Sequence, residues 1–198
     1  MYNCNNEKAS FVNCTNDGID SQKFWYAVVV QMNCEKSVSS KLTKLGILNY
    51  VAIQRETHQW SDRRKRIDRI VIPMIVFVRI TARQVYELKK CSFILKFLKY
   101  PGVKDFATPI PDEQIERLKY ILNNSNAKVS IIASLNVGDM VRVIKGPLKG
   151  IEGELGMIDG IRQVVAIRLY MLGYAYIELS KDCIELVDAS STNSRETL

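Results

Sequence analysis

The pattern of apolar residues changes near residue 134, and this change constrains the fold more than any other feature of the sequence. Before it, short β-branched and aromatic runs alternate with segments whose apolar residues recur at helical spacing. After it, short apolar runs follow one another, separated by Gly, Asp or Lys. The 198 residues are enough for two small domains. We therefore expect an α+β chain of two domains.

The first half is predicted to run strand, helix, strand, strand, helix, strand. The predicted strands are residues 24–31, 47–54, 71–80 and 92–100, and the predicted helices are residues 34–46 and 82–91. This order is typical of a split βαβ (ferredoxin-like) four-stranded antiparallel sheet with both helices on one face. A third helix, residues 111–122, is expected to close the domain (residues 23–122) through Ile115, Leu118 and Leu122. The other face of the sheet would stay bare.

The second half is predicted to form a small barrel of about five strands, over residues 135–188. Its β-patterned runs are residues 140–144, 151–158, 163–169, 174–179 and 183–187. The turn-rich residues 123–134 are expected to be a linker. Residues 1–22 and 189–198 are polar and without periodicity, which indicates disordered tails.

The net charge of +7 is concentrated in the first domain. Residues 23–112 carry seventeen Lys or Arg against seven acidic residues, a net charge of +10, whereas residues 134–188 sum to −2. So concentrated a charge indicates a surface that meets phosphate. The alternative is a basic face that is merely solvated.

A run of cations between the second and third predicted strands is too long for a tight turn, and we expect it to form the tip of an extended hairpin. Arg63, Arg64, Lys65 and Arg66 are expected to contact phosphates, while His58 and Trp60 could stack on, or hydrogen-bond to, an unpaired base. Stacking on an aromatic ring contributes about 1 to 3 kcal/mol per base. The alternative is a charge run that serves only solubility.

Residues 137–158, VGDMVRVIKGPLKGIEGELGMI, contain the most specific motif of the chain. Gly146, Gly150 and Gly153 fall in a tight β-turn-β, where positive φ or close backbone approach excludes a side chain. A phosphate-binding loop is disfavoured because GPLKG lacks the G-K-[ST] ending and no helix follows. The stretch resembles the KOW motif, which occurs in NusG-type transcription factors and also in RNA-binding ribosomal proteins.

The first domain distinguishes these two possibilities. WYAVVVQ, the basic hairpin and VIPMIVFV resemble the N-terminal domain of NusG-family proteins, and the resemblance extends over residues 24–188. With its long basic hairpin and polar N-terminal tail, the chain resembles a specialised paralogue, similar to RfaH and especially to the UpxY type of antiterminator for polysaccharide operons. The resemblance implies a transcription elongation and antitermination factor that binds RNA polymerase and suppresses pausing or termination. A ribosomal-type KOW RNA-binding structural protein remains the alternative, disfavoured by the negative barrel region.

The resemblance also implies partners for particular residues. The bare sheet face would bind the clamp helices of the largest RNA polymerase subunit, through Val29, Ile75, Phe77 and Tyr100. The alternative is that these residues belong to the core, because strand alternation does not say which face is covered. The hairpin would read non-template DNA in the transcription bubble. The barrel would recruit ribosomal protein S-ten, Rho or another elongation component.

One part of the family pattern is missing from the second helix. Gln84, Tyr86 and Glu87 stand near the place where RfaH has a Thr-rich motif that contacts the other large polymerase subunit. The resemblance therefore does not imply this contact for the chain. A fold-switching barrel is not expected either, because the glycines between Gly146 and Gly160 each cost about 1 kcal/mol in a helix.

No residue pattern points to catalysis, a cofactor or a metal. His58 is the only histidine, without a nearby Ser or Cys partner, and no carboxylate pair or metal-ligand spacing occurs. The cysteines are five in number and lack C-x-x-C spacing, which favours reduced thiols. Since no window is apolar enough for a membrane helix and no signal peptide is visible, we expect a cytoplasmic monomer without membrane contact.

Overall fold

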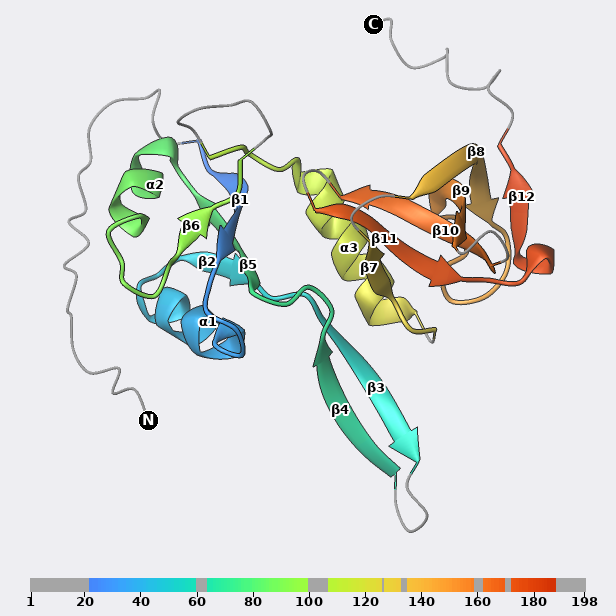
Figure 1. Cartoon of the computed structure of the whole chain (residues 1–198), viewed down its shortest axis with the longest axis horizontal. Coiled ribbons are helices and arrows are strands. Elements are labelled where there is room, and N and C mark those ends of the chain that lie inside the picture. Colours follow the sequence, from blue (N-terminus) through green and yellow to red (C-terminus); the bar gives the residue numbers. More distant parts are fainter. Residues whose placement is uncertain are drawn as a thin grey trace, which may run out of the picture.

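The computed structural model describes residues 22–59, 64–99, 107–125, 127–132, 135–158, 162–169 and 172–187. Within these residues the chain forms three α-helices, a short 3-10 helix and three antiparallel sheets (Figure 1). The mixed α/β class agrees with the expectation from sequence. Both predicted tails lie almost entirely outside the described residues.

The first sheet has the strand order β2-β5-β1-β6. Its strands are β1 (Phe24–Val29), β2 (Leu48–Tyr50), β5 (Ile75–Ile80) and β6 (Lys96–Phe97). Helices α1 (Glu35–Lys44) and α2 (Ala82–Leu88) share one core with one face of it, formed by Val38, Leu42, Val85 and Leu88 together with Tyr26, Val28, Val76 and Val78. Strand β6 is much shorter than the predicted residues 92–100, since only Lys96 and Phe97 are paired in register with β1.

The other face of this sheet is not bare, and that expectation was wrong. The residues that point to this face, Trp25, Ala27, Val29, Ile75 and Phe77, are all buried. They share one cluster with Ile115, Leu118, Ile121 and Leu122 of helix α3 (Asp112–Asn124). An apolar helix stripe and an apolar sheet face both gain by leaving water, and here they bury each other.

Strands β3 (Ile53–Gln59) and β4 (Arg64–Ile70) form a hairpin that is a sheet of its own. It projects away from the rest of the chain (Figure 1). The predicted strand of residues 47–54 is therefore two elements, because the chain leaves the first sheet after β2 and begins the hairpin at Ile53. The prediction of an extended hairpin at this place agrees with the structure.

The second half forms a six-stranded sheet in the order β12-β8-β9-β10-β11-β7. Its strands are β7 (Ser130–Ile132), β8 (Asn136–Val143), β9 (Glu152–Ile158), β10 (Arg162–Leu169), β11 (Gly173–Glu178) and β12 (Ile184–Leu186), with the 3-10 helix η1 (Lys181–Cys183) before the last. We call this part of the chain the barrel domain after the fold that the sequence predicts for it; in the strand order itself, β12 and β7 are edge strands. Strand β7 lies inside the predicted linker and pairs with β11, so the sheet has one strand more than expected.

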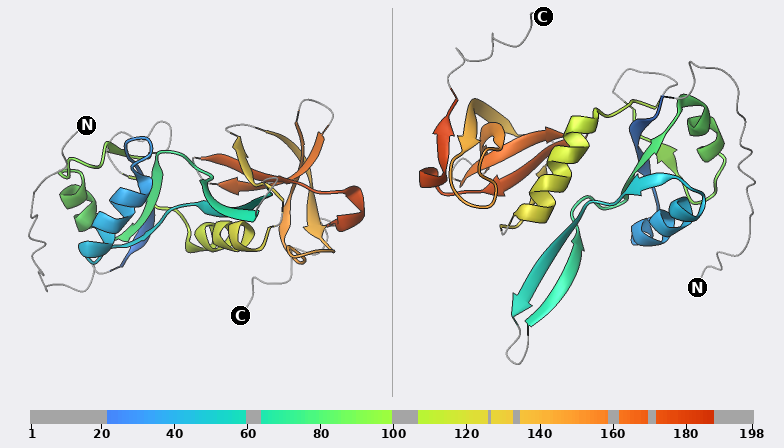
Figure 2. Two further views of the ribbon diagram at one scale, coloured as in Figure 1. Left: turned by 90° about the horizontal axis from the view of Figure 1, so that it is seen from below. Right: turned by 180° about the vertical axis from the view of Figure 1, so that it is seen from behind.

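Helix α3 lies between the first sheet and the barrel domain (Figures 1 and 2). Its apolar residues share one cluster with Val143, Leu148, Ile167 and Leu169 of the barrel domain. The Tyr120 hydroxyl also donates to the carbonyl of Pro147 over 3.5 Å. The third helix therefore joins the two halves as well as closing the first.

Candidate nucleic-acid interface at the hairpin

The hairpin brings together most of the residues that the sequence predicted to bind nucleic acid. His58 is opposite Lys65 in the register, and the adjacent pairs are Thr57 with Arg66 and Gln59 with Arg64. All of these positions lie at the end of the hairpin far from the body of the chain (Figure 1). Trp60 and Arg63 are outside the described residues. Cationic positions thus occupy the far end of β4.

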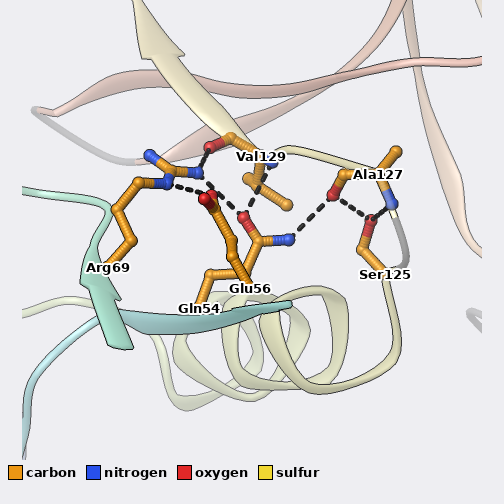
Figure 3. Close-up of polar contacts among 6 residues, drawn as sticks. All are labelled: Gln54, Glu56, Arg69, Ser125, Ala127 and Val129. Atoms are coloured by element: carbon orange, nitrogen blue, oxygen red, sulfur yellow. Dashed lines mark hydrogen bonds and ion pairs between the residues drawn. The ribbon is translucent and has the colours of Figure 1, made fainter. Parts of the chain in front are cut away.

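A polar network holds one side of the hairpin base against the segment between α3 and β7 (Figure 3). Gln54, which is 2% exposed, accepts from the Val129 amide at 3.0 Å and donates to the Ala127 carbonyl at 2.8 Å. Arg69 donates to Gln54 Oε1 at 2.8 Å and to the Val129 carbonyl at 2.6 Å, and it is paired with Glu56. Each of these three side chains therefore has at least one polar partner, as a part-buried network requires.

The opposite side of the hairpin base is tied to α1. Lys36 Nζ lies 3.1 Å from Asp68 Oδ2, with both side chains about half exposed. Asp68 is next to Arg69 in β4, and successive strand residues point to opposite faces. Contacts on both faces therefore fix the direction in which the hairpin projects.

The network residues were not among the predicted site residues. The sequence pattern does not single out Gln54, Glu56 or Arg69. One sequence signal was available for Gln54, an uncharged polar residue that directly follows the apolar run VAI. Its partners, the Val129 amide and the Ala127 carbonyl, are backbone groups more than seventy positions away and leave no mark in the sequence.

Three of the four residues predicted to contact polymerase are buried in this structure. Val29, Ile75 and Phe77 are 8%, 7% and 1% exposed. Tyr50 stacks on Phe77 with 6.2 Å between ring centroids. Tyr100 lies outside the described residues. An apolar surface formed by these side chains becomes available only if the contacts of their cluster open.

The second helix uses one of its three noted residues for its own structure. The side-chain oxygen of Gln84 accepts from the Thr81 amide at 3.0 Å, and the backbone amide of Gln84 donates to the Thr81 hydroxyl at 3.3 Å. This reciprocal capping box stabilises the start of α2. Tyr86 and Glu87 are exposed.

The glycines of the KOW-like turn have two different reasons to be glycine. Gly146 and Gly150 have φ angles of +87° and +92°. At Gly153 the reason is space, because a Cβ would lie 2.8 Å from the Ala166 carbonyl oxygen. The turn places Leu148 in the core, where it is 4% exposed.

The described residues contain neither a metal-binding cluster nor a membrane-spanning helix. No group of three or more His, Cys, Asp or Glu side chains there could hold a metal ion. Among the same residues, no helix combines the length and the apolar character needed to span a membrane.

Comparison with known proteins places the hairpin in a family context. Residues 23–119 match the family model described as "NusG: Transcription termination factor nusG". The chain belongs to the NusG family. The matched range of this NusG-family chain contains the first sheet, the hairpin and most of α3, whereas the barrel domain lies beyond it.

Individual NusG relatives extend the match into the barrel domain. The chain is 26% identical to the transcription termination/antitermination protein NusG of Staphylococcus epidermidis, over 82% of this chain and 95% of the relative. It is 27% identical to the protein of the same name from Staphylococcus carnosus, with the same coverage. A solved structure, "Domain interaction in Thermotoga maritima NusG", matches with 19% identity, a TM-score of 0.45, and coverage of 84% and 98%.

Proposed function

We propose that this protein is a transcription termination/antitermination factor that binds RNA polymerase and suppresses pausing or termination, in the manner of an operon-specific NusG paralogue. Its curated relatives, matched over 95% of their length, are named transcription termination/antitermination protein NusG. In this proposal the first domain is a split βαβ module and the second a KOW barrel. The observation that carries it is the braced hairpin, whose cationic end projects from the body of the chain (Figure 1).

In the proposed mechanism the hairpin binds the non-template strand of the transcription bubble. Arg63, Arg64, Lys65 and Arg66 supply charge, while His58 and Trp60 contact unpaired bases. Fixing the base of the hairpin lowers the conformational entropy lost when its tip binds. The factor would favour one state of the polymerase only by binding that state more tightly.

The clamp helices of the largest polymerase subunit would contact the first domain at Val29, Ile75, Phe77 and Tyr100. Since the first three are buried, this contact requires a rearrangement around α3. The barrel domain would recruit a ribosomal protein or Rho.

The ribosomal-type RNA-binding alternative is weakened by the way cations are used in the barrel domain. Arg142 lies 2.6 Å from Glu152 and 3.7 Å from Glu185, and Arg168 lies 3.6 Å from Glu154. Guanidinium groups with carboxylate partners offer little net charge to a phosphate.

The proposal is tested with the full chain and core RNA polymerase. We expect immobilised polymerase to retain the chain and read-through at a terminator to rise when the chain is added. Arg63→Ala combined with Arg64→Ala should leave retention unchanged and lower both single-stranded DNA affinity and read-through severalfold. Lys145→Ala combined with Lys149→Ala is the matched control, because it removes the same charge from exposed barrel positions. No retention, together with RNA binding, would favour the ribosomal alternative.

A further inference from the structure

A second basic surface lies on the first domain, away from the hairpin. It consists of four lysines at the ends of two helices, Lys41 and Lys44 in the last turn of α1, and Lys89 and Lys90 just after α2. Lys41 connects the two pairs, since its Nζ lies 5.4 Å from the ring centroid of Phe93 in the segment that follows α2. We call these residues the helical lysine surface.

Among the described residues these ammonium groups have no carboxylate partner, unlike several other cations there. Lys36, Lys119 and Arg142, for example, each form an ion pair. In the part of the chain that the structure describes, none of the four lysines has one. Three of them, Lys44, Lys89 and Lys90, are exposed. Their charge is therefore available to an anionic partner.

Stabilising the negative ends of the helix dipoles is one role for these lysines. That role needs a cation within the last turn of each helix, which Lys41 or Lys44 alone would supply for α1. It does not account for two unpaired cations at each of two adjoining helix ends. The excess charge points to a ligand that presents several negative groups at once.

The aromatic rings near these lysines indicate which form of nucleic acid the surface would bind. Lys89 Nζ lies 5.3 Å from the ring centroid of Tyr86, and Lys41 lies over Phe93. Surfaces that bind single strands offer aromatic faces for bases to stack on. Here an ammonium group already lies over each ring, so the surface offers charge and no free stacking platform.

We propose that the helical lysine surface binds the phosphate backbone of double-stranded DNA, at a site separate from the hairpin. The two sites are related through α1, whose first turn is paired with the hairpin base through Lys36 and whose last turn carries Lys44. Eight residues of helix separate these positions by about 12 Å along the axis. The chain would hold duplex DNA on its helices and unpaired DNA on its hairpin.

The test uses two double variants of the full chain, Lys41→Gln with Lys44→Gln, and Lys89→Gln with Lys90→Gln. The matched control is Lys145→Gln with Lys149→Gln, which removes the same charge from exposed barrel positions. Binding to a short blunt-ended DNA duplex is measured by fluorescence anisotropy between about 50 and 200 mM salt. Circular dichroism checks that each variant keeps its helices.

We expect each helical variant to weaken duplex binding about tenfold, and to lower the slope of log affinity against log salt by about 1 to 2, because each phosphate contact contributes about 0.9. The control should stay within twofold of the unaltered chain. Duplex affinity and salt slope that match the control in both helical variants would overturn the proposal. This outcome leaves the hairpin and polymerase assays unaffected, so the two proposals fail separately.

Discussion

Tyr50 lies where the first sheet meets α3, and its hydroxyl is held in its neutral form. Burial, together with the Glu116 carboxylate, raises the pKa of Tyr50 to about 12. Lys119 lies above this ring and above Trp25, with 5.5 and 5.1 Å to the ring centroids. These contacts bring an aromatic residue of β2, one of β1 and a cation of α3 together.

A raised pKa has a definite effect on stability at high pH. Between the ordinary value of 10.0 and about 12, the folded protein keeps a proton that the unfolded chain loses, so the free energy of unfolding falls as pH rises through this range. We expect tyrosinate absorbance to show a residue that titrates near pH 12 and is missing from Tyr50→Phe. A Tyr50→Phe titration identical to that of the unaltered chain would contradict this. Burial also raises the pKa of Tyr26. Because Tyr26 is present in both the unaltered chain and Tyr50→Phe, it serves as an internal comparison.

Gly153 provides a second prediction at the residue scale. A Cβ at Gly153 would lie 2.8 Å from both the Ala166 carbonyl oxygen and Val165 Cγ1, and the carbonyl belongs to a paired strand. We expect Gly153→Ala to lower the free energy of unfolding by about 1 to 3 kcal/mol, measured by urea denaturation. Gly138→Ala is the matched control, because its Cβ would meet its nearest atom at 3.8 Å. Equal stability of the two variants would show that β9 can shift away from β10.

At the scale of elements, the hairpin base and the segment after α3 depend on one buried amide. Gln54 links the Val129 amide and the Ala127 carbonyl to β3. We expect Gln54→Ala to cost about 1 to 3 kcal/mol, because the buried Val129 amide loses its acceptor. Hydrogen exchange at Val129 should become faster in this variant. Arg55→Ala, an exposed neighbour in the same strand, should leave that exchange unchanged.

The elements that the sequence predicted best are those with a strong local pattern. Val38 and Leu42 recur at helical spacing and are buried in α1. The run of cations is too long for a tight turn, and it correctly indicated an extended hairpin. Strand β7 was missed because its three residues carry little pattern beside a polar, turn-rich stretch. The covering of Phe77 was missed because it depends on where α3 lies, and alternation along β5 is the same whichever face is covered.

At the scale of the whole molecule, α3 belongs to both halves of the chain. Ile115, Leu118 and Ile121 share one cluster with Trp25 and Phe77 of the first sheet and with Ile167 and Leu169 of the barrel domain. The helix lies between these two parts of the chain (Figure 2). A sequence boundary near residue 123 therefore does not mark a boundary in the core. The two halves are continuous through this helix, although their sheets are separate.

The shared helix has a practical consequence for anyone who wishes to study the halves apart. A cut after residue 122 would leave a first domain that exposes the barrel-facing side chains of α3 to water, and a second domain with an uncovered apolar patch. Surfaces of that kind promote self-association. If either fragment then failed to bind a partner, self-association of the fragment would explain the loss as well as a missing interface would. Single substitutions in the intact chain are the sounder way to assign partners to each half.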